Sequence, residues 1–410
     1  MANQQGPSSR PGAAGAARTR GSAELEALLR DEIAGRGPIP FARFMERVLH
    51  HPEHGYYAKP EPVVGAGGDF LTSPALHPAF GRALWRQIDQ LLRLTGSQPP
   101  ATVLEIGAGA GQMARDIVLA ARDAGTAGGL RYLIREQSER LRRQQAETVA
   151  SAWENAPVFW VDGLEAARPV QVVVMNELMS ALPVHRLVYT GRDWHELYVD
   201  LDGDGFKVVH GPVTEPRATA AVAAAGVDPV PGQILDVNVA AADMLADIAA
   251  CLDRRAFILN IDYGGPAELV YSPARPRGTL RCYYRQALVD DPFARIGRQD
   301  LTADVDFDLL RRAADRLGLA SQGPIPQGAF LVNLGIEREA RALAERARRG
   351  DLAAEQELQR VYALYAPEAL GRSFWVMVHS RGFRRPPRLR GFAPAPPPLT
   401  YADLLLGDTR

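Results

Sequence analysis

Apolar strands and amphipathic helices alternate through the middle of the chain. The hydrophobic pattern predicts strands at 102–106, 131–135, 157–161, 171–175 and 256–261, and helices at 111–122, 138–151, 238–252 and 305–317. Strands that alternate with helices usually pair in parallel and are covered on both faces. The pattern therefore predicts an α/β fold around a mostly parallel sheet. Three earlier helical patterns, at 23–34, 40–50 and 77–95, precede this alternation.

The region 185–211 interrupts the alternation with three short strand patterns, at 185–189, 196–200 and 206–209. The last two are joined by Asp202-Gly203-Asp204-Gly205, which are turn-forming residues typical of a hairpin. This turn also resembles a calcium-binding loop, but the twelfth position, where a bidentate glutamate is required, is Gly211. We interpret 185–212 as an inserted β-hairpin region beside the functional edge of the sheet.

The pattern divides the chain into four parts. Residues 1–23 have no acidic side chain and are expected to form a disordered tail; an organelle transit peptide is the alternative, disfavoured by Pro7 and Pro11. Residues 24–98 are expected to form a helical segment that acts as a lid, and 99–380 the α/β domain. Residues 381–410 are rich in arginine and proline, and we expect an extended, solvated tail there.

Composition excludes several classes of protein. The formal net charge of −1 over 410 residues gives no general attraction to nucleic acid or to an anionic membrane. Two cysteines exclude a disulfide scaffold and favour a reducing compartment, so we expect a cytoplasmic protein without a membrane span. His50, His51 and His54 lack paired ligands at metal-binding spacing, so we expect no metal.

The most informative motif is a glycine-rich turn between the strand 102–106 and the helix 111–122. Its glycines are Gly107, Gly109 and Gly111, and a dinucleotide-binding loop would need the third glycine at position 112, which is Gln112. With Glu105 two residues before the first glycine, the turn instead looks like the S-adenosylmethionine loop of class I methyltransferases. A turn that only joins a strand to a helix is the alternative interpretation.

Polar residues follow three of the predicted strands. Glu136 lies 25 residues after Gly111 and is placed to accept both hydroxyl groups of a ribose; a solvated glutamate at a helix start is the alternative. Asn176 and Glu177 follow the next strand, where an acid that caps a helix is the alternative. Asp262 follows a third strand. Because carboxyl ends of parallel strands meet at one edge, these side chains are expected to line one pocket.

Nine motifs in order resemble the MidA family of S-adenosylmethionine-dependent methyltransferases, over roughly residues 38–380. They are Gly55-Tyr56-Tyr57, Gly68-Asp69-Phe70 with Thr72-Ser73-Pro74, the glycine loop with Glu105, Glu136-Gln137-Ser138 with Leu141, Arg142 and Gln145, Asn176-Glu177 with Ala181-Leu182-Pro183, Asp262-Tyr263-Gly264, Gly278-Thr279-Leu280-Arg281, Asp300-Leu301-Thr302-Ala303 with Val305-Asp306-Phe307, and Gln327-Gly328 with Phe330-Leu331.

The resemblance implies a fold, a cofactor and a site. The fold is the class I methyltransferase (Rossmann-like) fold, with a seven-stranded, mostly parallel sheet under an N-terminal helical lid. S-adenosylmethionine is the cofactor, and the residues expected to bind it are Glu105, Gly107, Gly109, Gly111, Glu136, Asn176, Thr72 and Pro74. Glu177 is expected to orient the substrate, with Asn176 and Asp262 beside it. Tyr56 and Asp69 are expected to contribute to the lid.

The resemblance also implies a substrate. Mitochondrial members of the family are complex I assembly factors that symmetrically dimethylate an arginine, so a protein substrate, such as a respiratory complex I subunit, is expected. A homodimer is a further expectation, as is the mitochondrial matrix if the source is eukaryotic. Ser180 stands where the family has an acid, and Asp304 is the candidate to replace that acid. A small-molecule methyltransferase and a non-catalytic cofactor-binding assembly factor remain the alternatives.

Overall fold

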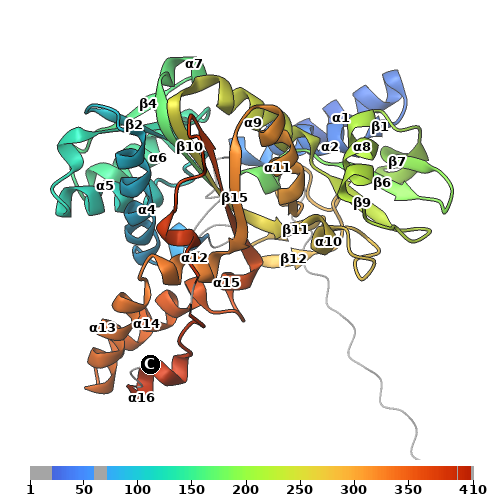
Figure 1. The fold of residues 1–410 in the computed structure, drawn as a ribbon. Helices are drawn as coiled ribbons and strands as arrows, with labels where there is room; N and C mark the ends of the chain where they lie inside the picture. The colour runs from blue at the N-terminus through green and yellow to red at the C-terminus, as the bar shows by residue number, and fades with distance from the viewer. Residues whose placement is uncertain (1–20, 60–71, 395, 408–410) are drawn as a thin grey trace, which may run out of the picture.

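The computed structural model describes residues 21–59, 72–394 and 396–407 (Figure 1). Its main sheet has the order β15-β16-β10-β5-β2-β3-β4, and β14 pairs with β10 as an eighth strand. The strands are β2 (Ala101–Ile106), β3 (Leu130–Arg135), β4 (Val158–Val161), β5 (Val170–Asn176), β10 (Leu252–Gly265), β14 (Val305–Asp306), β15 (Ala320–Pro326) and β16 (Phe374–Arg381). Every neighbouring pair is parallel except those that β16 makes with β10 and β15.

The predicted α/β fold is confirmed. The five strands expected from the hydrophobic pattern are β2, β3, β4, β5 and β10. The described residues form eight strands in this sheet rather than seven, because the two-residue β14 joins the end of β10 through Gly264 and Gly265. The hydrophobic pattern predicted a helix over 305–317, and the two residues of β14 stand at the start of that range. A strand this short directly before a helix leaves no hydrophobic pattern of its own.

Helices cover both faces of the sheet because neighbouring residues of each strand point to opposite sides. Val103 packs in one core with α4 (Ala79–Thr95), α5 (Gln112–Asp123) and helices from the C-terminal part of the chain. Leu104 packs in the other core with α9 (Val239–Cys251) and α11 (Phe307–Arg316). The next helix on the first side is α6 (Glu139–Ala150), which follows β3. Figure 1 shows these two layers on either side of the strands.

A second sheet contains the predicted insertion. Its order is β1-β7-β6-β9, with β8 paired to β7, and its strands are β1 (Ile39–Pro40), β6 (His185–Tyr189), β7 (Trp194–Asp202), β8 (Gly205–Gly211) and β9 (Ile234–Val237). The N-terminal helices α1 (Ala23–Arg36) and α2 (Phe41–His50) share a buried core with it, which includes Phe41, Phe44 and Val199. The N-terminal segment and the insertion are therefore one packed unit.

Shorter elements connect these layers. They are η1 (Tyr56–Ala58), α3 (Ser73–Leu76), η2 (Ala127–Gly129), α7 (Leu164–Ala167), η3 (Met179–Ala181), α8 (Pro216–Ala225) and α10 (Ala267–Val270), with a three-stranded sheet of β11 (Arg281–Tyr284), β12 (Ala287–Val289) and β13 (Asp300–Thr302). Of the N-terminal tail predicted at 1–23, residues 1–20 lie outside the described residues. Helix α1 begins at Ala23, where the Ser22 hydroxyl caps it by accepting from the N–H of Leu25.

The expectation of an extended, solvated C-terminal tail is wrong for residues 389–394 and 396–406. The chain forms α12 (Gln327–Asn333), α13 (Glu337–Arg348), α14 (Leu352–Tyr365) and α15 (Leu370–Ser373), returns through β16, and ends in η4 (Arg390–Phe392) and α16 (Tyr401–Leu406). Leu389, Leu399 and Leu404 are buried in the core that α4 and α13 share. Three leucines spread over sixteen residues make too sparse a pattern to predict this packing.

Candidate active site

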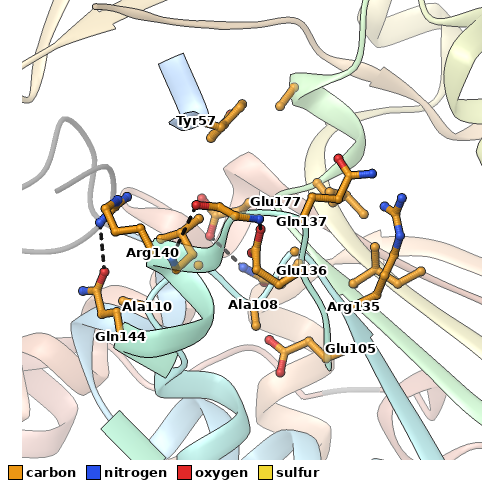
Figure 2. Close-up of a pocket in the computed structure, with 18 of the residues that line it drawn as sticks. Tyr57, Glu105, Ala108, Ala110, Arg135, Glu136, Gln137, Arg140, Gln144 and Glu177 are labelled. Atoms are coloured by element: carbon orange, nitrogen blue, oxygen red, sulfur yellow. Dashed lines mark hydrogen bonds between the residues drawn. The ribbon is translucent and has the colours of Figure 1, made fainter. Parts of the chain in front are cut away.

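A cavity of about 830 Å³ lies beyond the carboxyl ends of β2, β3 and β5. Figure 2 shows Glu105, Glu136 and Glu177 among the side chains around it, with Tyr57 on the side of the N-terminal segment. Most of the predicted site residues line this cavity: Thr72, Pro74, Glu105, Gly107, Gly109, Glu136, Asn176 and Glu177. The rule that ligands bind at the carboxyl edge of a parallel sheet therefore pointed to an edge where the structure has a cavity.

The glycine loop needs glycine for two reasons. Gly107, Gly109 and Gly111 have φ angles of 74°, 54° and 85°, in the left-handed region that other residues avoid. A side chain at Gly111 would also place its Cβ 2.9 Å from the Cα of Gln145, and one at Gly107 would meet Leu178 at the same distance. Gly111 is the N-cap of α5 and does not line the cavity, so its part is to let α6 approach the loop.

Gln145 links the loop to the predicted ribose-binding acid. Its Nε2 donates to the carbonyl oxygen of Gly109 at 3.0 Å and to Glu136 Oε2 at 3.1 Å, and its Oε1 accepts from Trp160 Nε1 at 2.8 Å. Glu136 Oε1 accepts from the N–H of Ser138 at 2.9 Å. The side chain of Glu136 therefore both binds the start of α6 and lines the cavity, with its orientation set from two sides.

Glu105 occupies the floor of the cavity. It is almost fully buried in the middle of the sheet, and the Tyr132 hydroxyl donates a hydrogen bond to its Oε2 at 2.7 Å. Burial raises the pKa of Glu105 to about 7, and the hydrogen bond from Tyr132 opposes that rise. A carboxyl group with this pKa changes its charge near neutral pH.

Glu177 has the most unusual conformation in the site. Its φ of 55° is rare for a residue with a side chain, and its N–H donates to the carbonyl oxygen of Ile261 at 2.9 Å. Glu177 Oε1 accepts from Asn176 Nδ2 at 2.9 Å and from the N–H of Ser73 at 3.3 Å. Burial, helped by the charges of the buried acids Asp262 and Asp300, raises the pKa of Glu177 to about 8, and the hydrogen bonds from Asn176 and Ser73 oppose that rise. Such backbone strain is typical of functional sites.

Asp262 does not lie in the cavity, contrary to its predicted role beside Glu177. It is fully buried; Oδ2 accepts from the N–H groups of Met179 at 2.8 Å and Ser180 at 3.2 Å, and Oδ1 accepts from that of Tyr263. Burial raises the pKa of Asp262 to about 6, and these hydrogen bonds oppose the rise. Asp262 therefore holds the loop that follows Glu177 in place and acts as a positioning residue.

The departures from the family pattern also lie outside the cavity. Ser180 is buried, and its carbonyl oxygen accepts from the N–H of Ala303 at 2.9 Å. Asp304 pairs with both Arg275 and Arg281, so its carboxylate is already neutralised and does not substitute for an acid at 180. Neither Ser180 nor Asp304 lines the cavity.

The N-terminal segment forms the wall opposite the glycine loop. Tyr57, not the predicted Tyr56, lines the cavity, and its hydroxyl donates to Asp300 Oδ1 at 3.1 Å. Tyr56 is fully buried in the N-terminal core. His50 also lines the cavity; its Nε2 donates to the carbonyl oxygen of Ala181 at 3.1 Å, and its ring stacks on Tyr57. Asp69 lies outside the described residues.

Tyr57 and Gln145 belong to motifs in the sequence that assign them no role, and no motif indicated His50 as a site residue. For Tyr57 the sequence did contain a signal, because Tyr57 directly follows Tyr56 in the motif Gly55-Tyr56-Tyr57. Within the described residues, no group of three or more His, Cys, Asp or Glu side chains is placed to hold a metal ion. No helix in that part of the chain is long and apolar enough to cross a membrane.

Comparisons with known proteins indicate a family of methyltransferases. A family described as "Putative S-adenosyl-L-methionine-dependent methyltransferase" matches residues 83–325. The protein named "Protein arginine methyltransferase NDUFAF7 homolog, mitochondrial" from Drosophila melanogaster is 30% identical over 336 residues, which are 76% of this chain and 75% of that protein. "Protein arginine methyltransferase NDUFAF7, mitochondrial" from Mus musculus is 30% identical over 84% of this chain and 81% of its own length.

Solved structures resemble the whole fold. A COG1565 superfamily member from Burkholderia thailandensis, in a crystal structure bound to S-adenosyl-homocysteine, is 34% identical, with a TM-score of 0.82. The match covers 91% of this chain and 95% of that one. A native crystal structure of a COG1565 superfamily protein from the same organism has a TM-score of 0.78 at 35% identity.

Proposed function

The chain belongs to this family of S-adenosylmethionine-dependent methyltransferases, and from that premise we propose that it methylates the guanidinium group of an arginine in a protein substrate. Because the chain belongs to this family, it is a methyltransferase that uses S-adenosylmethionine. The arginine substrate is supported by the names of its relatives and by one observation in the site. Glu177 presents a strained, partly buried carboxyl group at the edge of the sheet where an acceptor must approach.

The residues of the cavity fit the cofactor. Asn176 Oδ1 is buried without a hydrogen-bond partner among the described residues, so it is available to accept from a ligand. We propose that Glu136 binds the ribose hydroxyls, and that Gly107 and Gly109 let the backbone approach the ligand closely. Asn176, Glu105, Thr72 and Pro74 line the remainder of the site. When bound, S-adenosylmethionine supplies an electrophilic methyl group.

Glu177 is proposed to orient the acceptor. The side chain of arginine is a protonated, positively charged guanidinium at neutral pH, and a carboxylate can bind it through two parallel hydrogen bonds. Glu177 Oε1 accepts from the N–H of Ser73 and from Asn176, whereas Oε2 has no hydrogen-bond partner among the described residues and is available to a ligand. A bound cation favours the ionised carboxylate, which lowers the pKa of Glu177 from about 8. The nitrogen that receives the methyl group loses one proton to solvent.

We also propose that the N-terminal segment 24–98, of which the structure describes residues 24–59 and 72–98, acts as a lid. Tyr57, Thr72 and Pro74 support this, because they line the same cavity as Gly109.

A respiratory complex I subunit as the substrate and a homodimer as the working unit remain predictions. So do a cytoplasmic location and, in a eukaryote, the mitochondrial matrix; the relatives named above are mitochondrial proteins.

The test of the proposed function is to add the protein and tritium-labelled S-adenosylmethionine to a lysate of cells that lack this protein. The measurement is transfer of the labelled methyl group to molecules in that lysate. We expect a labelled protein band that releases methylarginine on acid hydrolysis. A label confined to the low-molecular-weight fraction would select the small-molecule alternative. Cofactor binding without any labelled product would select the non-catalytic alternative. The serine at position 180 does not favour the non-catalytic alternative, because Ser180 is buried away from the cavity.

A further inference from the structure

A second hollow, of about 370 Å³, lies outside the methyltransferase site. It is lined by Arg86, Asn333, Leu334, Gly335, Arg338 and Arg390, and it shares none of these residues with the first cavity. These residues come from α4, the end of α12, the start of α13 and η4; α4, α12 and α13 are labelled in Figure 1. Three of the six lining residues are arginines, and none is acidic.

Arg86 forms a fixed part of this hollow. Its Nη1 donates to the carbonyl oxygen of Leu334 at 3.0 Å, and its Nη2 donates to Glu339 Oε1 at 3.1 Å. The same carboxylate also accepts from Arg82 Nε at 2.9 Å. One negative charge is thus shared between two arginines, which leaves a net positive charge at the hollow.

Arg338 and Arg390 have no such counter-charge. Both are exposed, and within the described residues neither guanidinium forms an ion pair. The backbone that carries Arg390 is nevertheless well fixed, because its N–H donates to Gln90 Oε1 at 2.9 Å. The Asn333 amide donates to the carbonyl oxygens of Gly391 at 3.0 Å and Ala393 at 2.7 Å.

We propose that this hollow binds a phosphate group. Like charges that converge on one space repel one another, and a bound anion relieves that repulsion. The planar guanidinium presents a fork of N–H donors that matches the oxygens of a phosphate, and clusters of arginine commonly recognise it for this reason. The ligand is free phosphate or the headgroup of an acidic phospholipid, which share this chemistry. The proposal is independent of the methyl acceptor.

The test is calorimetric titration of the full chain with inorganic phosphate and with pyrophosphate, with sodium chloride adjusted to constant ionic strength. We expect saturable binding that weakens about tenfold or more in the Arg338→Ala/Arg390→Ala double variant. The matched control is Arg316→Ala/Arg349→Ala, which removes two exposed arginines at the C-terminal ends of α11 and α13. The control should bind phosphate as the unaltered protein does.

A second arm distinguishes the two sources. Co-sedimentation with phosphatidylcholine vesicles that contain phosphatidic acid, lost in the Arg338/Arg390 variant but not in the control, identifies a lipid headgroup. Phosphate binding without co-sedimentation identifies a soluble ligand. S-adenosyl-homocysteine binding by both variants checks that they are folded, since neither pair lines the first cavity. The proposal is overturned if no phosphate or vesicle binding is detected, or if both double variants bind equally well.

Discussion

The main-chain N–H of Ser73 donates to Glu177 Oε1 at 3.3 Å, although the two residues are 104 positions apart. Ser73 begins α3, just before the helices that cover the sheet, whereas Glu177 follows β5. Asn176 donates to the same oxygen, so the carboxyl group is oriented both by the N-terminal segment and by the strand that precedes it. The proposed acceptor site therefore depends on two segments that fold against each other.

Gly111→Ala should weaken S-adenosyl-homocysteine binding about tenfold or more, because Gln145 must move and lose its hydrogen bond to Glu136. Gly96→Ala is the matched control, since Gly96 also has a left-handed φ, of 68°, but has open space around its Cβ position. Both variants should lose roughly 1–2 kcal/mol of stability from backbone strain. Calorimetry that finds equal affinities for the two variants would show that the contact with α6 is unimportant.

Glu136→Ala should weaken the same ligand roughly ten- to a hundredfold. A hydrogen bond to a charged group contributes on the order of 1.5–3 kcal/mol, and Glu136 is held toward the cavity by Ser138 and Gln145. Glu147→Ala, an exposed change on α6, should leave the dissociation constant unchanged. If the folded Glu136 variant binds as the unaltered protein does, this glutamate does not contact the ligand.

Stability should fall as the pH rises toward 8. The pKa of Glu177 is raised from 4.5 in its ordinary state to about 8, so the folded protein binds more protons than the unfolded protein between these values. The free energy of unfolding therefore decreases across that window, and Glu105, with a pKa of about 7, acts in the same direction. Melting temperatures at pH 5 to 8 should decline less steeply in Glu177→Gln than in the exposed control Glu147→Gln. Parallel declines would contradict the raised pKa.

Asp262→Asn should destabilise the fold with little effect on ligand affinity. The amide nitrogen of asparagine cannot accept a hydrogen bond, so at least one of the N–H groups of Met179, Ser180 and Tyr263 loses its partner. The expected loss is on the order of 1.5–3 kcal/mol of unfolding free energy, measured by denaturant titration. Asp228→Asn, at an exposed position, should be neutral. An unchanged stability for Asp262→Asn would argue against its positioning role.

The sequence predicted the features that depend on local chemistry. Glycine spacing, the acid at the end of β3 and the Asn176-Glu177 pair after β5 all follow from rules about strand ends, and the structure brings these residues to one cavity. The choice between Tyr56 and Tyr57 depended instead on the direction in which a single 3₁₀ turn faces. That direction is set by packing against α2 and β13, which no local pattern encodes.

Asp262 shows the same limit, inside β10 and level with the end of β5. It does lie at the predicted edge, but the chain after β5 folds over it and presents the N–H groups of Met179 and Ser180 to its carboxylate. The pairing of β16 with β10 was likewise unpredictable, because it joins residues more than a hundred positions apart across the C-terminal helices. The residue types indicated which positions matter for the site. The tertiary contacts that assign a role to each residue could not be predicted from the sequence.

The most direct test of the proposed function is the rate of methyl transfer by Glu177→Gln, measured with the labelled protein acceptor. This change keeps the shape of the side chain and removes the charge that would bind a guanidinium. The rate should fall by about a hundredfold or more, as is typical when an electrostatic contact made in the transition state is removed. The dissociation constant for S-adenosyl-homocysteine should change little. Transfer at the unaltered rate by a folded Glu177→Gln protein would contradict the role of Glu177 as the residue that orients a cationic acceptor.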